Sequence, residues 1–173
     1  MALASVASNH AQHHPLTATI DYRGGTSVED LANDMAVNDN ESALFDVICI
    51  LEVLEHATDV DSLLSSASSL LKPDGTLFVS TVNKNMKSYL MAILGAEYIM
   101  GYLPPGTHTW DQFLSPQDVA DKMGKVGMEV INVQGMVATA PPPIGNWNWK
   151  LDPQDVDVNW IGAYRHAGVV DRE

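Results

Sequence analysis

The stretch that decides the fold spans residues 45–82 and reads FDVICILEVLEHATDVDSLLSSASSLLKPDGTLFVSTV. Residues 45–51 are rich in β-branched side chains and apolar on both faces, which is typical of a strand buried between helix layers. Residues 59–71 place apolar side chains at a helical period, and residues 72–75 predict a turn that ends this helix. A second apolar strand over residues 76–82 completes a strand, helix, strand unit. A crossover of this length implies parallel pairing, so the sequence predicts an α/β fold.

Length and composition fit one folded domain. The chain has 173 residues, of which 46% are hydrophobic and 18% are charged, and this excludes a chain that is disordered throughout. The formal net charge of -13 makes unspecific contact with nucleic-acid phosphates unfavourable, so we expect no nucleic-acid partner. Cys49 is the one cysteine, which leaves no disulfide within the chain and fits a reducing compartment.

Toward the amino terminus the elements are shorter. Residues 6–11 predict the end of a helix that stops before Pro15, because proline disfavours helical geometry in the residue before it. We expect a short strand over residues 19–22, a loop or helical turn over residues 27–32 and a polar loop over residues 33–43. No targeting signal is recognisable at this end.

Toward the carboxyl terminus one helix and two strands are expected. The helix begins at Ser115-Pro116, an N-cap followed by a first-turn proline, and stops at Gly127. Residues 128–137 and 156–164 alternate as strands. The segment between these strands, with three consecutive prolines and two tryptophans, predicts a stiff aromatic loop.

The residues Glu52-Val53-Leu54-Glu55-His56, called the acid turn below, follow the first strand directly. Open α/β sheets bind ligands at the carboxyl ends of their strands, so this is a candidate functional position. On a helical turn, spacings of three and four bring Glu52, Glu55 and His56 to one side, where two carboxylates and an imidazole suit Mg²⁺, Mn²⁺ or Zn²⁺. Spacing alone also allows, and on its own favours, acids that complement a helix dipole and a histidine that faces solvent.

Several runs of sequence carry a family resemblance. They are FDVI (45–48), LEVLEH (51–56), LKPDG (71–75) and STVNKN (80–85), followed by KSYLMAILGAEYI (87–99), PPGTH (104–108) and DVNW (157–160). The first four, in this order and spacing, resemble a class I methyltransferase that uses S-adenosylmethionine. The later three resemble the ubiquinone-biosynthesis O-methyltransferases. The resemblance covers nearly the whole chain, from Val6 to about Tyr164.

The resemblance implies a Rossmann-like class I methyltransferase fold. Such a fold begins with a strand, a glycine-rich loop and a second strand, and none of these is recognisable here, so we expect an incomplete, amino-terminally truncated form. We therefore expect residues 1–173 to form a single partial domain. Its parts are a remnant (1–44), the strand-helix-strand with the acid turn (45–82), an insertion (83–114) and a closing helix with strands (115–173). Strands without neighbours leave open edges, which invite aggregation or pairing with another chain and predict marginal stability.

The resemblance also implies an activity, which is methyl transfer from S-adenosyl-L-methionine to a phenolic oxygen of a polyprenylated hydroxybenzene or catechol. Family members hold Mg²⁺ through the positions of Glu52, Glu55 and His56, and a bound cation lowers the pKa of a phenol from its usual value of about 10. Leu51 matches a position that touches the methyl donor, and Val28-Glu29 matches the segment beside the adenine. The alternative is an inactive form that acts as a binding or assembly partner in a multi-enzyme quinone-biosynthesis complex.

His108 lies in a Gly-Thr-His segment and is a candidate proton acceptor, because a neutral imidazole near pH 7 suits general base catalysis. The alternative is a histidine that fixes the loop by hydrogen bonding. His10, His13 and His14 also have helical spacing, but they lie beside a proline and far from the acids in sequence. We expect these three to be solvated surface side chains.

Residues 88–103 are apolar around almost their full circumference, with Lys84 and Lys87 just before them. This length is too short to cross a bilayer, and Glu97 interrupts it. Two interpretations remain, a helix that lies in the membrane surface to collect a lipid-tailed substrate or an ordinary buried lid helix. We expect the membrane surface to be a partner through residues 84–103. The family resemblance places the protein peripherally at the matrix side of the mitochondrial inner membrane.

Overall fold

The computed structural model describes residues 2–11, 13, 16–17, 19–38, 44–91, 109–139 and 148–169. The helices are α1 (Ala2–Ala11), α2 (Val28–Val37), α3 (Val60–Leu70), α4 (Met86–Ser88) and α5 (Pro116–Lys125), and short 3-10 turns cover Leu54–His56 and Trp110–Gln112. The strands are β1 (Phe45–Leu51), β2 (Leu71–Val82), β3 (Met128–Ala138), β4 (Trp149–Asp152) and β5 (Asn159–His166).

The five strands form one mixed sheet in the order β1-β2-β5-β3-β4. β1 and β2 pair in parallel with α3 as the crossover, which confirms the strand, helix, strand unit and the α/β fold expected from the sequence. β5 pairs with both β2 and β3 in antiparallel fashion, and β4 forms the far edge beside β3. β1 therefore lies at the other edge of the described sheet.

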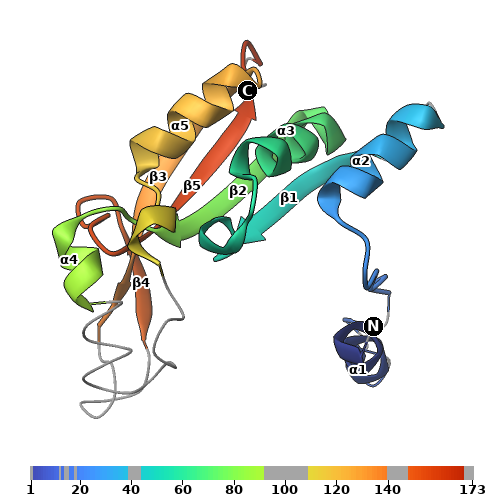
Figure 1. Cartoon of the computed structure of the whole chain (residues 1–173), viewed down its shortest axis with the longest axis horizontal. Coiled ribbons are helices and arrows are strands. Elements are labelled where there is room, and N and C mark those ends of the chain that lie inside the picture. The colour runs from blue at the N-terminus through green and yellow to red at the C-terminus, as the bar shows by residue number, and fades with distance from the viewer. Residues whose placement is uncertain are drawn as a thin grey trace.

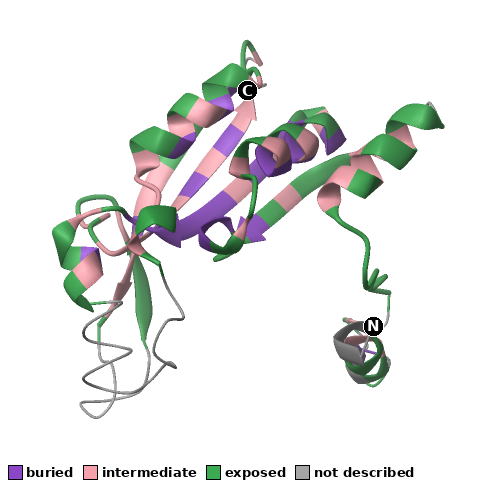
Figure 2. Cartoon of the chain, in the orientation of Figure 1, coloured by how far each residue is buried: buried purple, intermediate pink, exposed green. Residues whose placement is uncertain are grey.

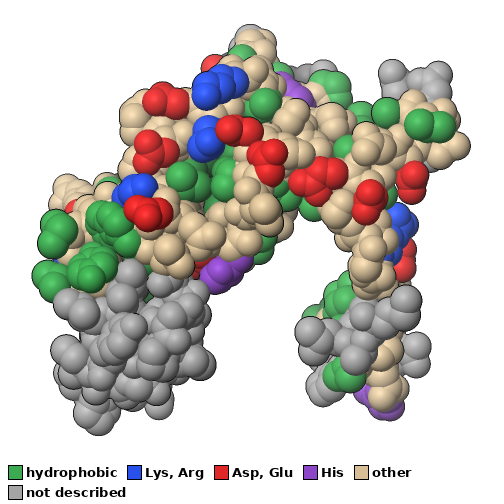
Figure 3. All heavy atoms as spheres, viewed as in Figure 1, with side chains coloured by type: hydrophobic (Ala, Val, Ile, Leu, Met, Phe, Trp, Pro, Cys, Tyr) green, Lys and Arg blue, Asp and Glu red, His purple; other side chains and the backbone are tan. Residues whose placement is uncertain are grey.

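The helices α3 and α5 lie against one face of this sheet, with α2 beside α3 (Figure 1). The main core fills the space between the sheet and these two helices. Its fully buried side chains include Leu64 and Ala67 on α3, Val119 and Met123 on α5, and, from the strands, Leu77, Val79, Trp160 and Tyr164. The same face carries a mixture of acidic and basic side chains on its outer surface (Figure 3). One pair, Lys122 and Asp61, joins α5 to α3 across 2.9 Å.

The start and stop of α5 follow the sequence prediction. The Ser115 hydroxyl accepts a hydrogen bond from the Asp118 N–H, while the Asp118 carboxylate accepts from the Ser115 N–H and hydroxyl. These hydrogen bonds lower the pKa of Asp118. Gly127 follows the helix with φ of +75°, a conformation that costs glycine little because it has no Cβ. This end of the chain is therefore specified locally.

Three predictions near the amino terminus need correction. Residues 19–22 form no strand, since they pair with none of the five strands of the described sheet. The expected turn and loop after Ser27 are instead the helix α2, which runs to Val37. Ser27 and Asp30 form a capping box that starts this helix, a signal that the interpretation of a polar loop overlooked. The predicted helix near the start is confirmed as α1.

Two predictions about the strands also need correction. Residues 72–75 are part of β2 and not a separate turn, but Phe45 pairs with Leu71 while Val47 pairs with Thr76. Three extra residues therefore bulge from β2, which reconciles turn-forming residues with a continuous strand. Trp149, expected in a loop, begins β4, and the strand expected from residue 156 begins at Asn159.

β1 is buried on one face only, whereas the sequence predicted burial on both. Ile48 and Ile50 face the core, while Phe45, Val47 and Leu51 are each more than 40% exposed. Alternate residues of a strand point to opposite faces, so these three side chains share the face of β1 that lies away from α3 and α5. We call it the open face.

The amino-terminal helix lies apart from the sheet. An extended segment, residues 20–27, leads from α1 to α2 and carries α1 away from the rest of the structure (Figure 1). Within the part of the chain that the structure describes, no helix is both long and apolar enough to span a membrane.

Candidate functional site at the end of β1

The acid turn begins where β1 ends, on the edge of the sheet where α/β proteins bind their ligands. Glu52 has φ of +53° and is the one described residue other than glycine with a positive φ. A side chain in this region costs about 1–3 kcal/mol, and such strain persists only where surrounding contacts fix it. The turn after β1 is thus held by specific contacts.

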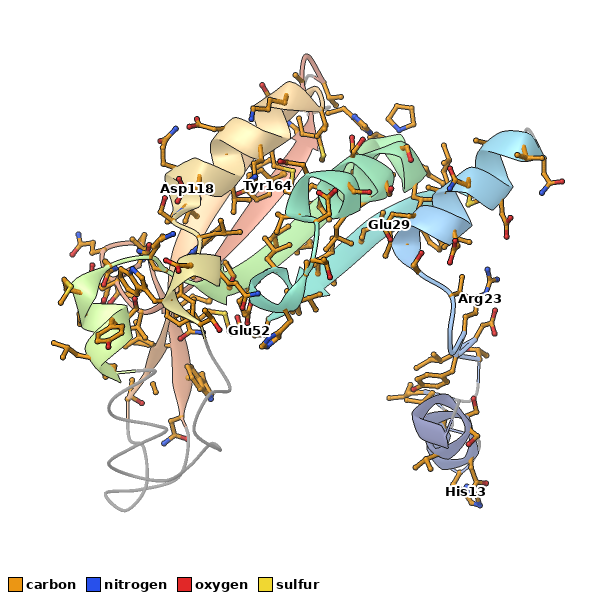
Figure 4. All side chains as sticks on the ribbon, in the orientation of Figure 1. His13, Arg23, Glu29, Glu52, Asp118 and Tyr164 are labelled. Atoms are coloured by element: carbon orange, nitrogen blue, oxygen red, sulfur yellow. The ribbon has the colours of Figure 1, made fainter. Side chains whose placement is uncertain are left out.

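Four hydrogen bonds with described residues hold Glu52. Its backbone N–H donates to the Ser80 carbonyl at 3.0 Å and to the Ser80 hydroxyl at 3.1 Å. The Ser80 hydroxyl in turn donates to Glu52 Oε1 at 2.6 Å, and Asn159 Nδ2 donates to Glu52 Oε2 at 2.9 Å. Figure 4 shows Glu52 at the carboxyl end of β1. The carboxylate therefore joins β1 to both β2 and β5.

Glu55 is held by a different strand residue. Its side chain is only 3% exposed, and Thr81, itself fully buried, donates a hydrogen bond from its hydroxyl to Glu55 Oε2 at 2.6 Å. Glu55 Oε1 lies 4.0 Å from His56 Nε2, and the His56 side chain is about half exposed. A buried carboxylate needs such partners, because its desolvation is otherwise costly.

These contacts overturn the expectation that the three side chains share one side of a helical turn. The 3-10 turn covers only Leu54–His56, so Glu52 lies before it in a left-handed conformation. Ser80 and Thr81 are consecutive in β2, and their side chains point to opposite faces of the sheet. Glu52 is bound on the open face, and Glu55 on the face that α3 and α5 cover.

The side chains of Glu52, Glu55 and His56 therefore have the right chemistry to bind a divalent cation but not the right arrangement. Two carboxylates and an imidazole are suitable ligands for Mg²⁺ or Zn²⁺. Among the described residues, however, no three histidine, cysteine, aspartate or glutamate side chains lie close enough together to hold a metal ion. In this conformation Glu52, Glu55 and His56 do not form a metal site.

The other candidate residues lie on separate elements. Leu51 is the last residue of β1 and is 47% exposed on the open face. Val28 and Glu29 begin α2, where Val28 packs against the edge of the main core. His108 lies outside the described residues.

Sequence reasoning missed the polar partners of the acid turn, Ser80, Thr81 and Asn159. Two hydroxyl residues at the carboxyl end of the apolar strand over residues 76–82 were the available signal. Polar side chains at that end of a parallel strand commonly serve a ligand or a neighbouring turn. Asn159 gave no such signal, because its contact depends on β5 lying beside β2.

Comparison with known proteins supports a methyltransferase. A family model described as "Methyltransferase domain" matches residues 5–133. Among curated proteins, "Ubiquinone biosynthesis O-methyltransferase" of Marinobacter nauticus is 44% identical over 117 residues, which are 68% of this chain and 47% of that protein. The Azorhizobium caulinodans protein of the same name is 41% identical over 132 residues, 76% of this chain and 48% of that protein. The chain spans about half the length of these relatives.

Solved structures agree on the fold. A SAM-dependent methyltransferase from Anabaena variabilis superposes with a TM-score of 0.52 at 15% identity, covering 91% of this chain and 63% of that one. The CurJ carbon methyltransferase gives a TM-score of 0.52 at 16% identity, covering 95% of this chain and 39% of that one. The predicted class I methyltransferase fold is confirmed by this similarity.

Proposed function

Since this chain belongs to the methyltransferase-domain family, we propose that it serves S-adenosylmethionine-dependent O-methylation of a polyprenylated hydroxybenzene or catechol in ubiquinone biosynthesis. The observation that carries this proposal is the 41–44% identity to relatives that bear the corresponding name. S-Adenosylmethionine supplies the methyl group in such a reaction. The substrate class and its polyprenyl tail are inferred from the family resemblance alone.

The described residues offer one wall of a donor site. Leu51 presents an exposed apolar side chain at the carboxyl end of β1, and the backbone of Glu52 beside it is fixed by Ser80. In methyl transfer to a phenol, an O–C bond forms while the S–C bond of the donor breaks, and the hydroxyl proton leaves. The reacting atoms must lie in line, so a rigid wall contributes through positioning.

Isothermal titration of the chain with S-adenosylmethionine tests this proposal, and two variants of β1 sharpen it. Leu51→Asp places a charge at the proposed wall and should abolish binding, whereas Val47→Asp introduces the same charge on the same face near the start of β1 and should leave binding intact. Equal loss in both variants, or no binding by the unaltered chain, would contradict donor binding here. Transfer of a labelled methyl group to a prenylated catechol then tests the reaction.

The magnesium prediction is independent of this proposed wall. It is carried by the resemblance at Glu52, Glu55 and His56, while the arrangement of these side chains does not favour it. Titration of the chain with MgCl₂, compared with Glu55→Gln, measures whether a cation binds at all.

We also propose that residues 84–103 bind a membrane surface, from which the protein collects its lipid-tailed substrate. Residues 92–108 lie outside the described part of the chain, but Met86, Leu90 and Met91 before them each expose more than half of their side chains. Trp110 packs edge-on against Tyr89, with ring centroids 5.5 Å apart, and anchors the base of this segment. Such exposed apolar side chains above a fixed base suit insertion among lipid headgroups.

The lysines near this segment do not strengthen that attachment. Lys87 donates hydrogen bonds to Asp157 and Asp155, and the bond to Asp157 is the main cause that raises the pKa of Lys87. Lys84 donates to the Asp111 carbonyl. With both ammonium groups bound to the protein and a net charge of -13, binding to lipid depends on apolar insertion.

Co-sedimentation with liposomes tests the membrane proposal. The double change of Ile93 and Leu94 to Asp should abolish binding, and so should Leu90→Asp with Met91→Asp in the described part. Leu151→Asp, at an equally exposed apolar residue on β4, is the matched control and should bind as before. Lipid binding that survives both double changes would rule the segment out.

A second candidate function is a non-catalytic partner in a quinone-biosynthesis complex, and the uncovered face of β1 favours it. Absence of S-adenosylmethionine binding together with retained association with other enzymes of quinone synthesis would support it. The mitochondrial inner membrane remains a proposal from the resemblance. The relatives named above are bacterial, and fractionation of cells that produce the chain would test the location.

A further inference from the structure

We propose that the two carboxylates of the acid turn are structural clamps on opposite faces of β2, and that hydroxyl and amide donors serve as their partners in place of a cation. Ser80 and Asn159 then act as positioning residues for Glu52, and Thr81 acts as the positioning residue for Glu55. Together they hold the turn after β1 in its left-handed conformation. The consequence for Leu51 rests on the proposed function, whereas the clamps themselves do not.

Both oxygens of the Glu52 carboxylate accept hydrogen bonds from groups fixed by the sheet. Ser80 is 1% exposed and its hydroxyl both donates to Oε1 and accepts from the Glu52 N–H, so it fixes the side chain and the backbone together. Asn159 is the first residue of β5 and donates to Oε2. Hydrogen bonds to a charged acceptor are the stronger kind, and they offset the strain of the positive φ at Glu52.

The two carboxylates are bound on opposite faces of β2, because their partners are consecutive residues of that strand. In β2, Thr81 shares its face with Leu77 and Val79, which lie in the main core, whereas Ser80 points to the open face. Asn159 pairs with Val82 and Ile161 pairs with Ser80, which places Asn159 on the same open face as Ser80. All contacts of the Glu52 side chain described here therefore lie across the sheet from the Glu55 carboxylate. For both carboxylates to reach one cation, the Glu52 clamp would have to open.

The Glu52 clamp joins parts of the chain that lie far apart in sequence. Glu52 is hydrogen-bonded to Ser80, which follows it by 28 positions in the chain, and to Asn159, which follows it by 107. One side chain therefore joins the ends of β1, β2 and β5. β2 and β5 run antiparallel, so the end of β2 and the start of β5 meet at this point. A turn tied to two strands keeps the end of β1, including Leu51, in one position.

Swapping the carboxylate of Glu52 and the amide of Asn159 between the two positions tests the Glu52 clamp. Asn159→Asp sets two carboxylates against each other and should lower the melting temperature by about 5 °C. Adding Glu52→Gln to this variant reverses the polarity, because the glutamine amide can donate to the new aspartate, and should recover most of the loss. Asn132→Asp is the matched control, since Asn132 Oδ1 accepts a hydrogen bond from Gln134 Nε2 and an aspartate keeps that acceptor.

Amide hydrogen exchange at residue 52 reports the position of the turn itself. Asn159→Asp should speed this exchange about tenfold, the equivalent of one lost hydrogen bond to a charged group, and the double variant should restore it. If Asn159→Asp fails to fold, Ser80→Ala removes the other donor and should speed the same exchange. A double variant no better than Asn159→Asp, or unchanged exchange at residue 52 in both single variants, would overturn the clamp.

Magnesium provides the opposing outcome. With clamps in place of a cation, millimolar MgCl₂ should leave the melting temperature of the unaltered chain where sodium chloride of equal ionic strength leaves it. A rise that Glu52→Gln and Glu55→Gln each abolish would show that these carboxylates hold a metal and would overturn the proposal. Failure of the chain to bind S-adenosylmethionine would contradict the proposed function but not the clamps.

Discussion

The two faces of the sheet differ in what covers them. On one face, α3 and α5 bury Leu64, Val119 and the strand residues beneath them, and the ribbon is purple along most of β2 (Figure 2). On the other face, Val47 and Leu51 remain about half exposed. Figure 2 shows β1 in green and pink over most of its length. One strand therefore belongs to a packed core on one side and to the surface on the other.

This difference shows that β1 is more apolar than its surroundings in the described structure require. A strand with one covered face normally alternates apolar and polar residues, whereas parallel strands covered on both faces are apolar throughout. β1 is apolar almost throughout, like a strand covered on both faces, but only one of its faces is covered in the described structure. The edge that β1 forms in the described sheet and its open face are thus surfaces suited to contact with another polypeptide.

The largest contrast is expected from shortening one side chain on each face. Leu64→Ala removes a fully buried side chain of α3 and should lower the free energy of unfolding by about 3 kcal/mol, from lost burial and the cavity left behind. Val47→Ala on the open face should cost less than about 1 kcal/mol. Urea denaturation of both variants measures the difference. Equal losses would mean that the open face is covered in solution.

The free energy of unfolding, measured over a pH series, tests whether water is excluded from Tyr164, which lies on β5 beside α5 (Figure 4). Burial raises the pKa of the Tyr164 hydroxyl above its usual value of about 10. Above that pH the unfolded chain releases a proton that the folded chain retains, so stability should fall by about 1.4 kcal/mol per pH unit. The stabilisation is complete below about pH 10 and is lost as the pH rises.

Tyr164→Phe isolates this contribution, because lysines titrate in the same range in both proteins. The variant should lack the additional loss above pH 10. At pH 7 it should be as stable as the unaltered chain or more so, since the buried hydroxyl has no hydrogen-bond partner among the described residues. Parallel pH dependence in the two proteins would contradict a buried, neutral hydroxyl.

The caps of two helices give a smaller contrast. Ser115→Ala should cost about 1 kcal/mol, because α5 is packed on the core through Val119 and Met123 and its cap contributes to global stability. Ser27→Ala removes the same type of capping box from α2, which has no buried residue. That loss should appear as faster amide exchange within α2, with little change in the urea midpoint. Equal shifts of the midpoint would show that α2 unfolds together with the core.

The smallest effect on stability is expected from Val47→Lys, which should change the free energy of unfolding by no more than about 0.5 kcal/mol. Its effect should instead appear in self-association, because a lysine on an edge strand opposes pairing with another chain. Sedimentation velocity over a range of concentrations should show less association than for the unaltered chain. Val37→Lys, at an exposed apolar residue of α2, is the control and should have no such effect.

Much of the covered layer was predictable from sequence because its signals are local. The apolar runs of β1 and β2 and the helical period between them specify the parallel pair. Ser115 and Gly127 mark the two ends of α5 through the geometry of the residues next to them. Each of these signals lies within a few residues of the structure that it specifies.

The site was less predictable because its geometry is set by distant residues. Spacings of three and four imply a shared side only on a continuous helix, and Glu52 leaves the helical region at φ of +53°. Its partner Asn159 is brought near only by the pairing of β5 with β2. For the same reason β4 was missed, since its four residues are a strand only through pairing with β3.

The bond between Asn159 and Glu52 also orders events during synthesis. A ribosome makes β1 and its serine partner early, but the asparagine follows 107 residues after the glutamate. Until that late segment has left the exit tunnel, the nascent chain holds this corner by the earlier contacts alone. Completion of the corner therefore requires β5, the strand that lies between β2 and β3.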